Sequence, residues 1–125
     1  MTVRVFLVED SLQVRDQLAS HLASAGRFRV VGHATNETEA NQWLREHVGE
    51  WDVAVVDLVL EHGSGMAVLS KASRLPGAGK IAVYSAYATS AVEEHCRALG
   101  ADAVFEKADP KGLLAWLSGL GAAPL

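Results

Sequence analysis

The sequence Val53-Ala-Val-Val-Asp57 is a run of small and β-branched apolar residues that ends in a carboxylate. A run with no charge before its last residue predicts a strand that is buried on both faces of a parallel sheet. A carboxylate beside such a strand is costly to bury unless something nearby needs negative charge. Ligands of open parallel sheets bind at the carboxyl ends of the strands, so Asp57 is the first candidate functional residue.

Strand and helix patterns alternate on both sides of this run. The predicted strands are residues 3–8, 28–34, 53–57, 81–85 and 101–106. Apolar residues at helical spacing follow each strand, and Ser11, Asn36 and Asp109 are the predicted caps at three of the helix starts. Strands that alternate with helices predict an α/β fold, a doubly wound parallel sheet with five strands and five helices. Right-handed crossovers would then bring the carboxyl end of every strand to one edge.

Size and composition limit the classes of protein. A chain of 125 residues predicts one domain, which we expect over residues 1–120, followed by a C-terminal tail at 121–125. The formal net charge of −4 and the lack of a Lys/Arg cluster argue against nucleic-acid binding. Cys96 is the one cysteine, so no internal disulfide can form. No stretch approaches the roughly 18 apolar residues of a membrane helix, and a cytoplasmic protein is expected.

The predicted edge of the sheet collects a specific set of side chains. Glu9 and Asp10 follow the first strand, Asp57 the third, Ser85 the fourth and Lys107 the fifth. Three neighbouring carboxylates repel one another, and a Mg²⁺ ion would relieve that repulsion. The lysine offers a positive charge and the serine a hydroxyl to a phosphoryl oxygen. These groups are the ones that transfer of a phosphoryl group to Asp57 requires.

The chain resembles the receiver domains of two-component response regulators over essentially its whole length. The strand order 2-1-3-4-5 is that of the chemotaxis member of this family, and the resemblance implies the same flavodoxin-like order here. The matching segments are Phe6-Leu-Val-Glu-Asp10, Val53-Ala-Val-Val-Asp57 with Gly65 eight residues on, Ser85-Ala86 and Phe105-Glu-Lys107.

The resemblance implies a role for each candidate residue. Asp57 would accept phosphate from a phosphohistidine of a sensor histidine kinase or of a phosphotransfer protein. Mg²⁺ would be held by Glu9, Asp10, Asp57 and the backbone carbonyl of Val59. Lys107 would pair with the phosphoryl group, and Ser85 would move to hydrogen-bond it. That movement would reshape the face formed by the fourth helix, the fifth strand and the fifth helix, which would bind a downstream protein.

Several positions depart from the usual pattern of the family. Glu61 and Ala108 stand where proline is common, in the second case often after a cis bond. Val104 occupies the position of an aromatic residue that often acts as a rotamer switch. Because valine is stiff at χ1, the usual coupling between hydroxyl and aromatic ring is not expected here. Val59 and Tyr87 flank the expected phosphorylation site, and we expect them to hinder water and to slow self-dephosphorylation.

Other functions stay open at this point. An aspartate-nucleophile phosphatase also forms an aspartyl phosphate, but Val59 stands where that family has its general acid. A flavin-binding electron carrier would need a Ser/Thr/Gly-rich loop after the first strand. We expect a stand-alone receiver domain that is not an enzyme in the ordinary sense, although a receiver cut from a longer DNA-binding regulator would have the same sequence. Relay of phosphate, draining of phosphate from a kinase and target binding are equally compatible with it.

Overall fold

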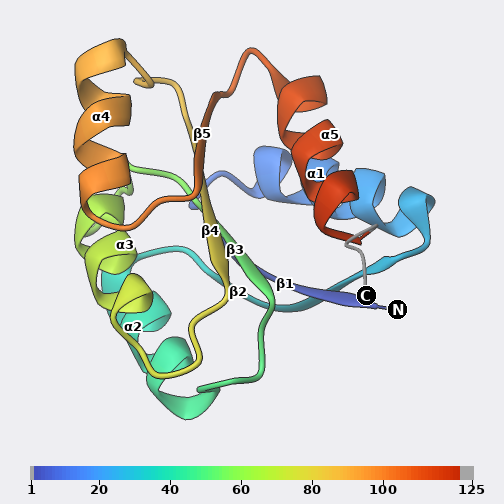
Figure 1. The fold of residues 1–125 in the computed structure, drawn as a ribbon, viewed down its shortest axis with the longest axis horizontal. Coiled ribbons are helices and arrows are strands. Elements are labelled where there is room, and N and C mark those ends of the chain that lie inside the picture. Colours follow the sequence, from blue (N-terminus) through green and yellow to red (C-terminus); the bar gives the residue numbers. More distant parts are fainter. Residues whose placement is uncertain (1, 122–125) are drawn as a thin grey trace.

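The computed structural model describes residues 2–121 and forms a parallel sheet between two layers of helices (Figure 1). The strands run in the order β2-β1-β3-β4-β5, and all four pairings are parallel, which confirms the predicted fold and strand order. The strands are β1 (Val3–Val8), β2 (Phe28–Ala34), β3 (Val53–Val56), β4 (Lys80–Ser85) and β5 (Ala103–Glu106). The helices are α1 (Leu12–Ala25), α2 (Glu37–Glu46), α3 (Gly65–Ser73), α4 (Ser90–Ala98) and α5 (Pro110–Gly121).

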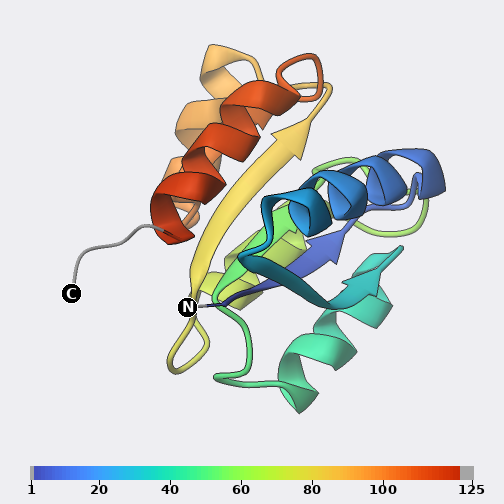
Figure 2. The same ribbon diagram turned by 90° about the vertical axis from the view of Figure 1, so that its right-hand side faces the viewer.

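The helices cover both faces of the sheet. Helices α1 and α5 lie on one face, and α2, α3 and α4 lie on the other (Figures 1 and 2). Side chains of β3 alternate between the two layers: Val53 and Val55 pack with residues of α1 and α5, whereas Ala54 and Val56 pack with residues of α2, α3 and α4. None of these side chains is more than 3% exposed. The run of residues 53–56 is therefore buried on both faces of the sheet, as predicted.

The caps of α1 and α2 lie at the residues that the sequence predicts. The Ser11 side chain accepts a hydrogen bond from the Val14 N–H, and Gly26 ends α1 with a left-handed φ of +76°. At α2, Asn36 Oδ1 accepts from the Glu39 N–H at 2.8 Å. The Glu39 carboxylate accepts in return from the Thr35 N–H, one residue before the cap. The N–H groups of Thr35 and Glu39 at the start of α2 thus both have partners.

Some boundaries differ from the sequence prediction. β3 ends at Val56, β4 begins at Lys80, and β5 begins at Ala103. Helix α5 includes Gly121, the first residue of the predicted tail, and residues 122–125 of that tail lie outside the described residues. Within residues 2–121 no helix has the length and apolar character needed to span a membrane.

Trp43 of α2 packs closely against the edge of the sheet. Its ring stacks on Phe6 with centroids 4.0 Å apart and on His47 with centroids 4.2 Å apart. A Cβ atom added to Gly32 of β2 would lie 2.3 Å from Trp43 Nε1. The ring is held from both sides, so it has little room to move away. Gly32 is therefore required by close packing.

We predict that Gly32→Ala lowers the free energy of unfolding by about 1–3 kcal/mol, because the added methyl group overpacks the Trp43 site. Urea unfolding followed by tryptophan fluorescence measures this. Gly119→Ala in α5 is the matched control, since nothing lies within 4 Å of its added Cβ. That variant should be unchanged or up to about 1 kcal/mol more stable. Equal stabilities of the two variants would contradict the packing argument.

Candidate functional site

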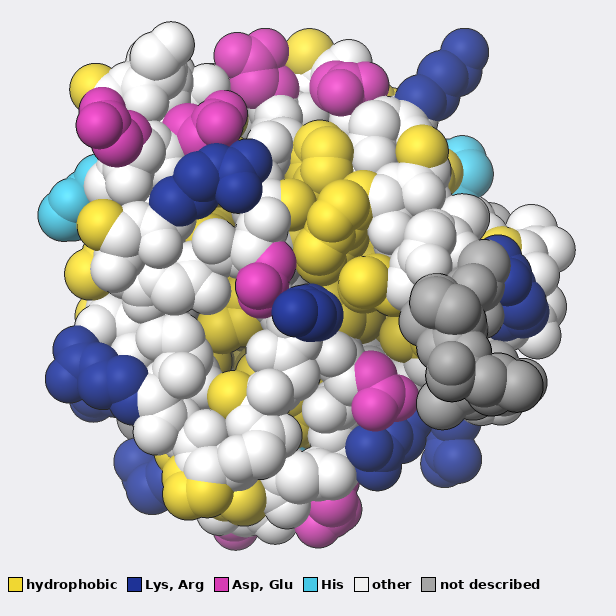
Figure 3. Space-filling model, in the orientation of Figure 1, with side chains coloured by type: hydrophobic (Ala, Val, Ile, Leu, Met, Phe, Trp, Pro, Cys, Tyr) yellow, Lys and Arg dark blue, Asp and Glu magenta, His cyan; other side chains and the backbone are white. Residues whose placement is uncertain are grey.

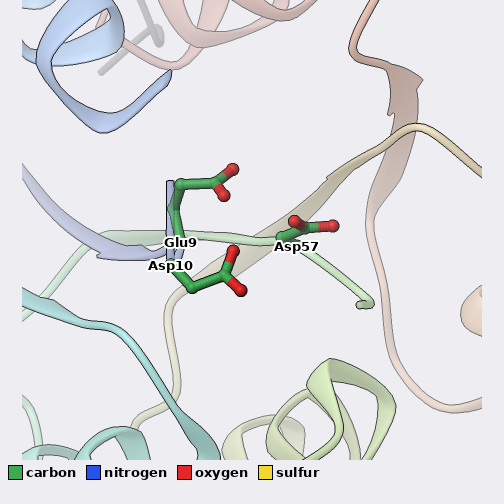
Figure 4. A group of neighbouring side chains, drawn as sticks. All are labelled: Glu9, Asp10 and Asp57. Atoms are coloured by element: carbon green, nitrogen blue, oxygen red, sulfur yellow. The ribbon is translucent and has the colours of Figure 1, made fainter. Parts of the chain in front are cut away.

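Three carboxylates meet at the carboxyl edge of the sheet. Glu9 and Asp10 follow β1, and Asp57 follows β3; the two strands are adjacent and parallel, with Val8 opposite Val56. One oxygen from each carboxylate lies within 4.8 Å of the others, and Figure 4 shows the three side chains converging. The structure thus brings together the acidic group that the sequence predicted.

Because these carboxylates are buried, their negative charges are costly in free energy. Glu9 is 3% exposed and Asp57 is 5% exposed, whereas Asp10 is half-buried. Burial raises the pKa of Glu9, and the nearby Asp57 charge raises it further. Hydrogen bonds from the Ser11 N–H and from Lys107 act in the opposite direction. Two carboxylates side by side in a buried niche require a compensating positive charge.

Lys107 supplies that charge. Its Nζ lies 2.9 Å from Asp57 Oδ2 and 3.0 Å from Glu9 Oε1. Burial alone would lower the pKa of Lys107, but its hydrogen bonds to Asp57 and Glu9 raise the pKa above the usual value for lysine. The ammonium group therefore stays charged and bridges the ends of β1 and β3.

Backbone N–H groups of the loop after β3 orient the carboxylates. Asp57 Oδ1 accepts from the Val59 N–H at 3.3 Å, and Asp10 Oδ2 accepts from the Glu61 N–H at 2.7 Å. The loop ends at Gly65, where an added Cβ would lie 1.8 Å from the Asp57 carbonyl oxygen. Only glycine allows α3 to begin this close to the site.

Ser85 lies beside the group but does not join it. Its side chain is fully buried, and its Oγ accepts a hydrogen bond from the Tyr87 N–H at 3.3 Å. Its carbonyl oxygen accepts from the Lys107 N–H at 3.0 Å. Within the described residues no hydrogen bond joins Ser85 to Asp57. Ser85 therefore holds the Lys107 backbone in this structure, and its predicted bond to a phosphoryl group requires a movement.

The donor set fits a hard divalent cation. Carboxylate oxygens are the protein ligands that Mg²⁺ prefers, and the half-buried Asp10 leaves one side of the group accessible to water and phosphate oxygens. Val59 lies two residues after Asp57, is 54% exposed and donates its N–H to Asp57 Oδ1. The role of its carbonyl as a metal ligand stays a prediction.

The environments of Cys96 and of the histidines do not indicate a part in the site. Cys96 is fully buried in the apolar core, and this burial raises the pKa of its thiol, as expected of a packing residue. In the described residues no histidine belongs to a group that could hold a metal ion. Every peptide bond of residues 2–121 is trans, including the bond between Lys107 and Ala108, where a cis bond is common in the resembling family.

Tyr84 is a residue at this edge that the sequence pattern did not identify. The Tyr84 hydroxyl donates a hydrogen bond to the Lys107 carbonyl oxygen at 3.2 Å. A hydroxyl-bearing ring in the otherwise apolar run Ile81-Ala-Val-Tyr84 was the signal that could have identified it, because a buried tyrosine needs a partner for its O–H.

Comparisons with known proteins agree with this geometry. The family model described as "Response regulator receiver domain" matches residues 5–117. Among solved structures, one described as the P1 domain of CheA3 in complex with CheY6 from R. sphaeroides matches at 29% identity and a TM-score of 0.77, covering 97% of this chain and 98% of that chain. A CheY-like receiver domain protein from Methanospirillum hungatei matches at 25% identity and a TM-score of 0.80, with 98% and 95% covered.

A third similar structure is a response regulator protein from Burkholderia pseudomallei. It is described as having a phosphorylated aspartic acid, a calcium ion and citrate. The identity is 26% and the TM-score 0.74, and the match covers 90% of this chain and 65% of that chain. The family match spans nearly all of the sheet and its helices, so the chain belongs to the response regulator receiver domain family of two-component signalling.

Proposed function

We propose that this chain accepts a phosphoryl group on Asp57 and passes the change to a protein-binding surface. The observation that carries the proposal is the contact of Lys107 with both Asp57 and Glu9, at 2.9 and 3.0 Å. It places a fixed positive charge beside a buried carboxylate nucleophile. Receiver domains as a family are phosphoacceptors and not enzymes in the ordinary sense.

The chemistry follows from the groups at the site. An oxygen of Asp57 attacks the phosphorus atom, a new P–O bond forms, and the bond from phosphorus to the donor nitrogen breaks. Lys107 then exchanges its contact with Asp57 for a phosphoryl oxygen and neutralises part of its charge. Mg²⁺ would neutralise the rest of the negative charge of the phosphoryl oxygens. It would be held by Glu9, Asp10, Asp57 and the carbonyl of Val59.

The donor we propose is a phosphohistidine of a sensor histidine kinase or of a phosphotransfer protein. The similar structure from R. sphaeroides, in which CheY6 is in complex with the P1 domain of CheA3, supports a partner of this kind. The phosphorylated aspartic acid and the calcium ion in the Burkholderia protein support the covalent product and an oxygen-ligated cation.

The output surface we propose is formed by α4, β5 and α5. Hydrophobic side chains are visible on this face between α4 and α5 in Figure 3. Val104 and Phe105 of β5, the edge strand, are half-buried there. Movement of Ser85 toward the phosphoryl group would release the Tyr87 N–H and shift the loop before α4. A downstream protein would recognise the changed surface.

Two alternatives carry less support. In the aspartate-nucleophile phosphatase hypothesis an acid should stand at Val59, an exposed apolar residue. The hypothesis that the chain is a receiver from a longer DNA-binding regulator leaves the chemistry at Asp57 unchanged and differs only in the output.

We predict that the purified protein gains the mass of one phosphoryl group when it is incubated with Mg²⁺ and phosphoramidate, and that Asp57→Asn does not. Intact-mass spectrometry measures this. Asp16→Asn, which removes an exposed carboxylate of α1, is the charge-matched control and should be phosphorylated like the wild type. Modification of Asp57→Asn to the same extent as the wild type would rule out Asp57 as the acceptor.

The rate of phosphate loss gives a separate prediction. Val59 and Tyr87 lie at the rim of the site, 54% and 62% exposed, so they cover it only in part. We expect Tyr87→Ala to accelerate phosphate release several-fold, because water then reaches the phosphorus atom more easily. Release of inorganic phosphate from the isolated phosphoprotein measures this. An unchanged rate would show that Tyr87 does not hinder water. The proposal that Asp57 is phosphorylated would not be affected.

A further inference from the structure

Tyr84 of β4 contacts Lys107 from the face of the sheet that α1 and α5 cover. Its side chain is 5% exposed and belongs to the apolar cluster that β4 shares with Leu113 and Leu117 of α5. At the end of this buried ring, the hydroxyl donates to the Lys107 carbonyl oxygen at 3.2 Å. The contact links a core residue to the backbone of the lysine that holds Asp57.

The backbone of Lys107 is held on both sides by consecutive residues of β4. The Lys107 N–H donates to the Ser85 carbonyl oxygen at 3.0 Å, and the Lys107 carbonyl oxygen accepts from Tyr84. Lys107 itself lies just beyond the end of β5. Ala108, which follows it, lacks the ring that fixes φ in proline. These two hydrogen bonds are therefore the local contacts that fix the direction in which the lysine side chain leaves the backbone.

Burial, more than the neighbouring charges, raises the pKa of Tyr84 and keeps its hydroxyl protonated and able to donate. Burial raises the pKa of Tyr84, the Lys107 charge lowers it, and the charges of Glu9 and Asp109 raise it. The net direction is upward, away from neutral pH. Removing the hydroxyl would leave the partly buried Lys107 carbonyl without this partner.

We propose that Tyr84 is a positioning residue for phosphoryl binding, which acts by fixing the backbone of Lys107 so that its ammonium group meets the phosphoryl oxygens. The inference rests on the proposed function, because it assigns Tyr84 to the same reaction. It predicts that loss of the Tyr84 hydroxyl weakens the affinity for a phosphoryl group but leaves the affinity for Mg²⁺ unchanged. Mg²⁺ would be held by carboxylates to which Tyr84 makes no hydrogen bond, whereas a phosphoryl group would be held in part by Lys107.

The test is Tyr84→Phe, which keeps the buried ring and removes only the hydroxyl. The probes are Mg²⁺ alone and beryllofluoride, a phosphoryl mimic, added to the Mg²⁺-saturated protein, both followed by calorimetric titration. We expect the Kd for Mg²⁺ to be unchanged and the Kd for beryllofluoride to rise about fivefold, the effect of one hydrogen bond. The rate of phosphorylation by phosphoramidate should fall by a similar factor.

Ser73→Ala is the matched control. Its Oγ also donates to a backbone carbonyl, that of Leu99 at 2.8 Å, but at the end of α3 farthest from the site. This variant should bind both probes like the wild type. Equal beryllofluoride affinity in wild type and Tyr84→Phe, or equal losses for Mg²⁺ and beryllofluoride, would overturn the inference. A wild type that binds no beryllofluoride and takes up no phosphate would instead overturn the proposed function.

Discussion

The site depends on one electrostatic constraint: two buried carboxylates, Glu9 and Asp57, share a single ammonium group. Lys107 is 98 residues from Glu9 and 50 residues from Asp57 along the chain, so only the fold brings the three together. In a niche where both acids are almost fully buried, their repulsion would be costly without the lysine. In the reaction that we propose, the phosphoryl group would bring negative charge to the place where Lys107 already provides a positive charge.

Parallel topology satisfies this constraint. The adjacent strands β1 and β3 bring Glu9, Asp10 and Asp57 to one edge, and the neighbouring strands β4 and β5 bring Ser85 and Lys107 to the same edge. The apolar strands behind them are packed on both faces, so the backbone positions of these side chains are rigidly held. The parts that we propose to change on phosphorylation lie in loops: the segment after Asp57, the turn at Tyr87 and the connection after Lys107. The hydrogen bond from Tyr84 joins the backbone of Lys107 to the core that α5 covers.

Much of this arrangement was predictable from the sequence, because it follows from local pattern. The buried run 53–56, the caps at Ser11 and Asn36, and the acidic and basic residues at strand ends identified both the fold class and the candidate residues. Two features were not predictable. The pairing of Lys107 with Glu9, in addition to Asp57, depends on side-chain directions across three strands. The Tyr84 contact joins side chain to backbone, and a strand pattern says nothing about which carbonyl a buried hydroxyl reaches. The observed strand ends also differ from the predicted ones by one or two residues, because the last backbone hydrogen bonds of a strand depend on its neighbour in the sheet.

A crystal structure of the protein grown with Mg²⁺ and beryllofluoride tests the central claim most directly. The account predicts one ion bound by Glu9, Asp10 and Asp57, beryllium attached to an oxygen of Asp57, and Lys107 Nζ within hydrogen-bonding distance of a fluorine. A beryllofluoride group bound elsewhere, or Lys107 turned away from an occupied Asp57, would contradict it.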